Sequence, residues 1–300
     1  MAAVTGRRRR LDPVGIFTYS CLGLWMLFAF FPIGWAYLSS LKTPEEIFVL
    51  PPKLIFTPTL HNYEVVFGLK IGTELETVTE VSGGTGAVSQ FPRYFLNSLI
   101  VSAGTTTLAL VIGCAAAYSL ARFRFVAKRY ILLGIIFVRM IPPVVLVIPF
   151  YVLWRSMGLM DTHIGLVIAY LSFNLPFTVW MMRGFFVDIP VELEEAAMVD
   201  GASRIAALVR IVLPLAAPGM AATAIFALLL SWNEFLFAVL LTADNSKTLS
   251  PSILNYMTDK AILWGRLYAA GCTVLLPVLI FSLSVQKHIA RGLTGGAVKG

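Results

Sequence analysis

The stretch DIPVELEEAAMVDGASRIAALVRIVLP occupies residues 188–214 and predicts two short helices that meet at a glycine. Asp188 is placed to cap the first helix with its side chain. Gly201 is suited to the left-handed backbone conformation that ends a helix, because it has no Cβ. Ser203 can then cap a second helix, which Pro214 is expected to stop. We expect these residues to form a helical hairpin.

The chain around this hairpin is strongly apolar. Of its 300 residues, 58% are hydrophobic and 13% are charged, and the mean hydropathy is +0.83. A soluble domain has roughly 25% charged residues. These values predict an all-α, polytopic membrane protein rather than a soluble globular core. The net charge of +7 comes from short basic clusters between apolar runs, which is typical of charge that sets membrane topology and not of nucleic-acid binding.

Six apolar stretches are long enough to cross a bilayer, which takes about 20 residues. They are Val14–Leu38, Phe95–Leu120, Ile131–Leu153, Ile164–Met182, Ala216–Leu241 and Leu263–Ser284. Several of them contain proline, which a membrane helix tolerates where neighbouring helices or a cavity satisfy the freed carbonyl groups. In the second stretch, small residues recur every four positions and predict close packing against another helix; they are Ala109, Gly113, Ala117 and Ala121.

The distribution of Lys and Arg predicts the orientation of the six spans. If the N-terminus lies inside, the inside segments carry more Lys and Arg than the outside segments. This bias predicts that both termini and the 188–214 hairpin are cytoplasmic. The loop between the first two spans then lies outside, and its second part, Lys70–Gln90, is predicted to be a turn-rich insertion. The polar loop Ala243–Ile262 also lies outside.

Several kinds of chemistry are absent from the sequence. It contains no G-x-x-x-x-G-K-[ST] phosphate loop, no G-x-S-x-G, no H-E-x-x-H and no C-x-x-C, so we expect no catalytic residue, no metal site and no ATP bound by this chain. Cys21, Cys114 and Cys272 fall inside apolar stretches and provide no disulfide framework. A membrane enzyme would need a nucleophile with a base, or metal ligands, inside the bilayer, and neither is evident.

Polar side chains within the spans are the candidates for a transport pathway, because they cost free energy in the bilayer. Arg139 is expected about 12 Å from the cytoplasmic start of the third span, and Asn174 about 15 Å from the outer start of the fourth, so the two lie near the same midplane depth. Trp232, Asn233 and Glu234 are expected nearer the outer mouth. A sugar suits such a cluster, since its ring stacks on an indole and its hydroxyls bind amide and carboxylate groups. Each residue could instead serve only a contact between helices.

The hairpin also carries a spaced pattern. Glu195-Ala196-Ala197, then Gly201, then Ile211, Leu213 and Pro214 match the EAA loop of bacterial ABC importer permeases. From about Pro13 onward the chain resembles the carbohydrate-uptake members of that family, of the maltose-transporter type. The other matching stretches are Asn97-Ser98, Gly158-Leu159 with Asp161-Thr162, Trp232–Leu236 and the glycine-rich tail Gly292–Gly300.

The resemblance implies a type I ABC importer permease fold and a bacterial cytoplasmic membrane location. Residues 1–94 would hold the first span and a long outer loop, residues 95–286 the permease domain, and residues 287–300 a cytoplasmic tail. The implied partners are a second homologous permease, two ATP-binding subunits that hold ATP and Mg²⁺, an extracytoplasmic substrate-binding protein and membrane lipid. This chain itself would carry no cofactor.

The resemblance also implies which residues couple the permease to the ATPases. In the hairpin they are Glu195, Ala196, Ala197, Asp200, Gly201, Ile211, Leu213 and Pro214. In the tail, Gly295 and Gly296 are expected to contact the ATPases within a flexible segment.

Three alternatives stay open at the level of sequence. The hairpin could be a solvated connector between two spans. The same machine could carry amino acids or inorganic anions, although anion cargo would favour several basic residues facing the pathway, and only Arg139 is a candidate. A secondary transporter or channel would leave the hairpin pattern unexplained.

Overall fold

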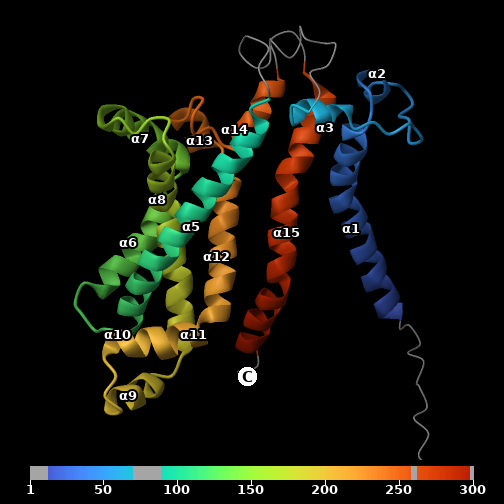
Figure 1. The fold of residues 1–300 in the computed structure, drawn as a ribbon. Helices are drawn as coiled ribbons and strands as arrows, with labels where there is room; N and C mark the ends of the chain where they lie inside the picture. The colour runs from blue at the N-terminus through green and yellow to red at the C-terminus, as the bar shows by residue number, and fades with distance from the viewer. Residues whose placement is uncertain (1–12, 70–88, 258–261, 298–300) are drawn as a thin grey trace, which may run out of the picture.

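The computed structural model describes residues 13–69, 89–257 and 262–297, and helices dominate these residues (Figure 1). In chain order they are α1 (Pro13–Ser40), α2 (Pro44–Ile47), α3 (His61–Val66), α5 (Phe91–Arg122), α6 (Lys128–Met140), α7 (Pro143–Met157), α8 (His163–Asp188), α9 (Glu192–Val199), α10 (Arg204–Ala207), a π-helix (Leu208–Val212), α11 (Leu213–Leu215), α12 (Ala217–Trp232), α13 (Leu236–Leu241), α14 (Leu249–Ser252), a 3₁₀ turn (Ile253–Tyr256) and α15 (Trp264–Ala297). The described residues contain no strand, only an isolated bridge between Met257 and Ile262. The predicted all-α fold is confirmed, while the predicted insertion at Lys70–Gln90 lies outside the described residues except at its last two positions.

Four described helices are long and apolar enough to cross a membrane, namely α1, α5, α8 and α15. Two further pairs pass the same test only if each bent pair is one span: α6 with α7, bent by 93°, and residues 204–215 with α12, bent by 76°. In the described part of the chain, six spans are therefore the upper count, and the predicted first, second, fourth and sixth stretches each form a single helix.

The third predicted span, Ile131–Leu153, is wrong as a continuous helix. It breaks at Ile141 and Pro142, which both have extended backbone angles. Each of these residues precedes a proline, and the residue before a proline is disfavoured in the helical region. Pro143 can then begin α7, since the first turn of a helix does not need its N–H.

The fifth predicted span, Ala216–Leu241, is also interrupted. Helix α12 ends at Trp232, and α13 begins at Leu236. Pro218 does not break α12, because it stands in the first turn. Asn233, Glu234 and Phe235 form the non-helical link between the two helices.

Helices α5 and α8 form the centre of the bundle, and α12 packs against both of them. The small residues of α5 lie in this contact: Ala109, Gly113 and Ala117 are buried. A Cβ atom on Gly113 would come within 2.6 Å of the Thr178 side chain, so only glycine permits this approach of the two backbones. The predicted close packing along this face is confirmed.

Buried apolar residues form three clusters along the bundle. One lies at the end of α5 and α8 that carries α9 to α11, around Tyr118 and Phe186. A second joins α7, α8 and α13 around Trp154, Tyr170 and Phe237. The third joins α3, α5, α14 and α15 around Phe91 and Trp232. The clusters thus divide between the two ends of the bundle.

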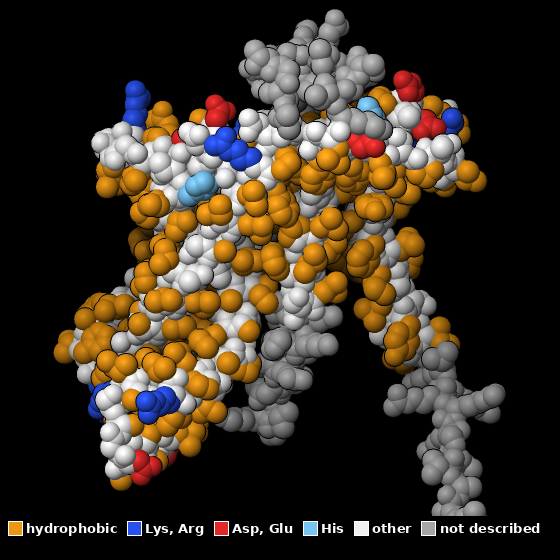
Figure 2. Space-filling model, in the orientation of Figure 1, with side chains coloured by type: hydrophobic (Ala, Val, Ile, Leu, Met, Phe, Trp, Pro, Cys, Tyr) orange, Lys and Arg blue, Asp and Glu red, His pale blue; other side chains and the backbone are white. Residues whose placement is uncertain are grey.

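Helix α1 stands apart from this bundle and contacts it along α15 (Figure 1). Its apolar side chains are almost all exposed within the single chain, from Val14 to Leu38. Figure 2 shows that hydrophobic side chains cover the middle of the visible face, while the charged side chains lie at its two ends. This distribution is that of a protein surrounded by a bilayer.

Candidate functional site: the α9–α11 hairpin

The 188–214 hairpin lies at one extreme end of the molecule, with α9 outermost and α10 and α11 beneath the bundle (Figure 1). Gly201 has φ +91°, the left-handed conformation that the sequence predicted. The Ser203 hydroxyl accepts a hydrogen bond from the Ala206 N–H over 3.2 Å and caps α10, as predicted.

Two details of the predicted hairpin are wrong. Asp188 does not cap the first helix: it is the last residue of α8, and α9 follows Val191 with no side-chain cap. Pro214 does not stop the second helix, because it lies within α11 and the sharp bend comes at Ala216. Proline has no backbone N–H, so Pro214 cannot make the usual hydrogen bond to the preceding helical turn. A π-helix, Leu208–Val212, directly precedes α11 and accommodates this missing bond.

A buried ion pair fastens the hairpin to the bundle. Arg122, at the last turn of α5, donates from Nε to the Glu194 carboxylate over 2.5 Å, and both side chains are almost fully buried. The Tyr118 hydroxyl donates to the second carboxylate oxygen over 2.7 Å. The Arg122 guanidinium also donates to the Ile189 carbonyl over 2.9 Å. One arginine therefore binds both sides of the turn between α8 and α9.

Sequence reasoning missed this contact. It singled out neither Arg122 nor Glu194, and Glu194 is one of three acids in the first turn of α9, with Glu192 and Glu195. The available signal was that Glu194 lies one residue before the Glu195-Ala196-Ala197 pattern. Which of the three acids turns inward depends on the packing of α9 against α5, and no local pattern supplies that information.

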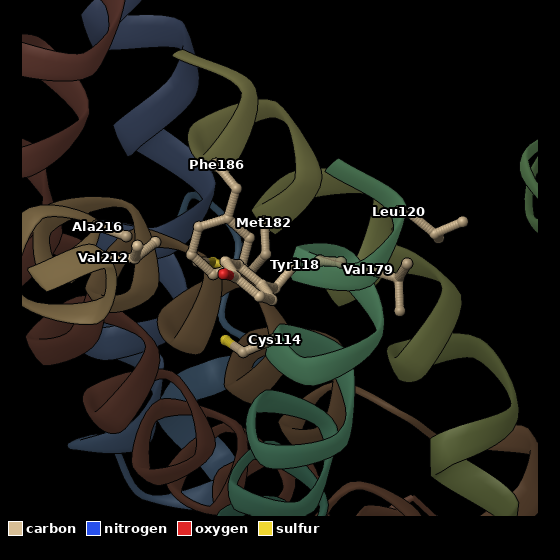
Figure 3. Packing of buried hydrophobic residues seen from close by; sticks show 9 residues of the cluster. Cys114, Tyr118, Leu120, Val179, Met182, Phe186, Val212 and Ala216 are labelled. Atoms are coloured by element: carbon tan, nitrogen blue, oxygen red, sulfur yellow. The ribbon is translucent and has the colours of Figure 1, made fainter. Parts of the chain in front are cut away.

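Apolar packing also joins the hairpin to the bundle core (Figure 3). Val212 of the hairpin and Ala216, which follows it, are buried in the same cluster as Met182 and Phe186 of α8. The Tyr118 ring packs edge-on against Phe186, with ring centroids 6.1 Å apart. The hairpin and the inner halves of α5 and α8 are thus held by both polar and apolar contacts.

The predicted coupling residues fall into two groups. Glu195, Ala196, Asp200, Gly201 and Pro214 are exposed, so a partner subunit can reach them. Ala197, Ile211 and Leu213 are half-buried.

An apolar patch accompanies the exposed coupling residues. Val199 is 86% exposed, Ile205 is 75% exposed and Val209 is more than half exposed. Exposed apolar groups at the tip of a charged hairpin are typical of a surface that another protein covers. The sequence analysis did not single out these three residues, although each lies within the quoted stretch.

The predicted pathway residues are spread through the bundle. Asn174 is fully buried on α8, and its amide donates to the Ser231 hydroxyl of α12 over 3.0 Å. Arg139, on α6, is exposed and lies over the Phe177 ring of α8, 5.1 Å from its centroid. The structure thus brings Asn174 to the end of α12 and Arg139 to the outside of α8.

Trp232, Asn233 and Glu234 occupy the break between α12 and α13. The Trp232 ring is 2% exposed, packs edge-on against Phe95 and Phe281, and donates to the Val274 carbonyl. It therefore offers no free face for a sugar in this conformation.

The two polar neighbours bind backbone. The Glu234 carboxylate accepts the N–H groups of Leu236, Phe237 and Ala238, over 3.0 to 3.2 Å, and so caps α13. The Asn233 amide donates to the Leu229 carbonyl of α12 over 2.9 Å. The two half-helices at this break are thus capped by side chains.

At the opposite end of the molecule from the hairpin, Asp161 organises the loop after α13. Its carboxylate accepts the N–H groups of Ala243, Asn245 and Ser246, and also the Ser246 hydroxyl. Burial raises the pKa of the Asp161 carboxyl, but the combined effect of these hydrogen bonds is larger and lowers the pKa to about 2. Asn97 holds the same loop by donating to the Asn245 and Lys247 carbonyls. Two of the stretches matched to the family, Asn97-Ser98 and Asp161-Thr162, thus meet here.

The tail differs from the expectation of a flexible segment. Helix α15 continues through Gly295 and Gly296 and ends at Ala297.

Among the residues that the structure describes, no three His, Cys, Asp or Glu side chains lie together as a metal site would require.

Comparison with known proteins gives a consistent result. Residues 109–295 match the sequence profile of a family described as binding-protein-dependent transport system inner membrane component. The chain is 33% identical to the trehalose transport system permease protein SugB of Mycobacterium tuberculosis, over 91% of this chain and 93% of that protein. It is also 33% identical to the diacetylchitobiose uptake system permease protein DasC of Streptomyces coelicolor, over 90% of this chain and 92% of that protein.

A solved structure shares the fold. It belongs to a bacterial ABC transporter involved in the import of the acidic polysaccharide alginate, and the match covers 95% of this chain and 99% of that chain. The TM-score is 0.69 at 22% sequence identity.

Proposed function

The chain belongs to the family of binding-protein-dependent transport system inner membrane components, and from this premise we propose that it forms the carbohydrate pathway of an ATP-driven importer. Membership makes it a permease subunit of an ABC importer and a multi-pass protein of the bacterial inner membrane, not an enzyme. That the cargo is a carbohydrate is our proposal beyond family membership. It is supported by the relatives, which include permeases of trehalose and diacetylchitobiose systems.

In the proposed complex, this chain pairs with a second homologous permease. Two separate ATP-binding subunits hold ATP and Mg²⁺, and an extracytoplasmic binding protein delivers the carbohydrate. The dependence on a binding protein is part of the family description, while the four-subunit core is our proposal.

The observation that carries the proposal is the attachment of the hairpin to the bundle. Arg122 binds Glu194 on α9 and the Ile189 carbonyl at the same time, and Val212 and Ala216 are packed in the core of α5 and α8. A force on the exposed tip of α9 is therefore transmitted to the inner halves of both central helices. ATP-driven closure of the two ATPases would tilt these helices and switch the pathway between inward-facing and outward-facing states.

We propose that both termini and the hairpin are cytoplasmic. The beginning of α1, the end of α15 and the hairpin lie at the same end of the molecule, in agreement with the excess of Lys and Arg in the segments assigned to the inside (Figure 1). The Asp161 loop and the segment from Ala243 to Ile262 then face the binding protein, although residues 258–261 lie outside the described part.

We place Arg139 in the proposed pathway because its side chain is exposed. Asn174, Ser231 and Trp232 are buried in this conformation, so a contact between any of them and the cargo would require another conformation of the bundle. Asn233 is exposed at the break and is retained as a candidate contact, while Glu234 would act through its cap on α13. The pathway polarity is mostly neutral, which suits hydroxylated cargo better than an inorganic anion.

The experiment is to purify the complete complex, reconstitute it in lipid vesicles with its binding protein, and measure ATP hydrolysis across sugars, polyols and glycerol phosphates. We expect one carbohydrate to stimulate hydrolysis and to be accumulated inside the vesicles. Stimulation by amino acids or inorganic anions alone would overturn the carbohydrate assignment. Uptake that follows an ion gradient without ATP would overturn the importer itself.

A further inference from the structure

A pocket of about 400 Å³ lies at the turn between α5 and α6. Its apolar walls come from the turn and from α6, and include Phe125, Val126, Leu133 and Ile136. Two cations, Lys128 and Arg129, line the same pocket from the first turn of α6. The pocket therefore combines an apolar lining with positive charge.

Among the described residues, these two cations have no acidic partner. In the part that the structure describes, neither Lys128 nor Arg129 forms an ion pair with a carboxylate, and the first turn of α6 contains no acid. Lys128 donates only to the Phe123 carbonyl, over 3.3 Å. Arg122 is different, because Glu194 balances its charge. The charge of the pocket is complementary to an anionic ligand.

The pocket lies beside the hairpin, at the same end of the molecule. Arg204 of α10 lies over the Phe123 ring, 5.3 Å from its centroid, and Phe123 opens the turn that forms the pocket. Figure 2 shows hydrophobic surface meeting Lys and Arg side chains at this end of the visible face. In the orientation proposed above, the α5–α6 turn would lie where the hydrocarbon region ends and the headgroup region begins.

We propose that this pocket binds an anionic phospholipid of the cytoplasmic leaflet. The phosphate would bind Lys128 and Arg129, and an acyl chain would lie against Val126, Leu133 and Ile136. A basic pocket on the cytoplasmic side of a membrane protein suits such headgroups, since the lipids of that leaflet carry negative charge. The assignment to this leaflet rests on the orientation proposed above. The lipid itself is a ligand that the transport proposal does not require.

The lipid would also influence the hairpin. Arg122 and Phe123 begin the turn whose other end lines the pocket, and both contact the hairpin, through Glu194 and Arg204 respectively. A ligand that orders residues 125–129 therefore restrains the point at which the hairpin is fastened. We expect hydrolysis of ATP to be coupled more tightly to transport in membranes that contain anionic lipid.

The test is native mass spectrometry of the whole complex, purified from bacterial membranes and titrated with phosphatidylglycerol or phosphatidylcholine. We expect the wild-type complex to retain phosphatidylglycerol in preference to phosphatidylcholine. The Lys128→Gln/Arg129→Gln variant should bind it roughly 30-fold more weakly, because each cation near an anionic surface contributes about a factor of five. Arg155→Gln, which removes an exposed cation at the end of α7, is the matched control and should not change retention.

Two further measurements make the result decisive. Glycerophosphoglycerol, which has the headgroup without acyl chains, should not displace the lipid, because it cannot make the contacts that an acyl chain makes with the apolar walls of the pocket. Equal retention of phosphatidylglycerol by the assembled double variant would overturn the proposal. Efficient crosslinking of a Leu133→Cys variant to the partner permease or to an ATPase would also overturn it, since a protein would then cover the pocket. Neither measurement depends on the identity of the transported solute.

Discussion

Glu194 differs from the two acids beside it in the first turn of α9. Glu192 and Glu195 are exposed, whereas Glu194 is buried against Arg122 and Tyr118. A buried ion pair of this kind contributes little net stability over an apolar replacement, but removing one partner leaves an uncompensated charge. Its importance here is geometric, because it fixes where α9 meets α5.

Glu194→Gln should therefore weaken the junction more than any exposed substitution in the hairpin. We expect a loss of about 3–5 kcal/mol at this contact, because Arg122 stays buried without its counter-charge. The measurements are thermal stability of the complex and substrate-stimulated ATP hydrolysis. Glu192→Gln is the control and should leave both unchanged. If Glu194→Gln behaves like Glu192→Gln, the ion pair does not fasten the hairpin.

Asp161 provides a second prediction at the scale of one residue. Its pKa lies at about 2, below the ordinary value of 3.8, so its contribution to stability is fully present above about pH 4. That contribution should be lost as the pH falls from about 4 towards 2, when the carboxylate gains a proton. In Asp161→Asn this pH dependence should disappear.

Hydrogen exchange checks the same contact near neutral pH. The amides of Ala243, Asn245 and Ser246 should be protected in the wild type and should exchange faster in Asp161→Asn. Amides of α14, which Asp161 does not contact in the described residues, serve as the internal reference. Unchanged protection in the variant would mean that other contacts of the loop, such as those of Asn97 and Arg93, are sufficient to hold it.

At the scale of elements, the hairpin depends on one backbone conformation. Gly201 has φ +91° and has open space around the position of a Cβ, so a side chain there would be strained by the backbone and not by a clash. Gly201→Val should cost about 1–2 kcal/mol in this turn and displace α9 from α10. We expect ATP-driven uptake to be lost while membrane insertion and pairing with the second permease persist.

Gly201→Asn is the matched variant, since asparagine tolerates the left-handed region. It should retain most of the uptake and should still retain the ATPase in a pull-down. Wild-type uptake by the valine variant would show that the turn geometry does not matter. Equal failure of both variants would assign the effect to the size of the side chain at the interface.

The elements also show what the sequence could predict. Long apolar runs predicted α1, α5, α8 and α15, and Gly201 and Ser203 predicted the turn and the cap, because these signals are local. The Pro142-Pro143 pair is also a local signal and indicates a break in the third span, whereas the sequence analysis expected a membrane helix to tolerate these prolines. The inward turn of Glu194 and the burial of Trp232 depend on which helices become neighbours, so residue spacing could not supply them.

At the scale of the molecule, the single chain has two charged ends and an apolar middle. The hairpin and the beginning of α1 lie at one end, and α2, α3 and α14 lie at the other (Figure 1). The proposed orientation places the first end in the cytoplasm.

This orientation predicts opposite labelling of two exposed positions. In a background without Cys21, Cys114 and Cys272, a cysteine at Ser203 should react with a membrane-impermeant reagent only from the cytoplasmic side. A cysteine at Lys53 should react only from outside. Opened vesicles, in which both should react, are the control. Reaction of both positions from one side of intact cells would refute the topology.

The break between α12 and α13 has a consequence for how such a bundle can move. The Glu234 carboxylate takes up the free amides of α13, and the backbone and side-chain nitrogens of Asn233 both donate to the Leu229 carbonyl of α12. Each half-helix is thus complete on its own side of the joint. A swing of α13 against α12 would change the torsion angles of three residues while leaving these capping bonds in place, so the joint can act as a pivot.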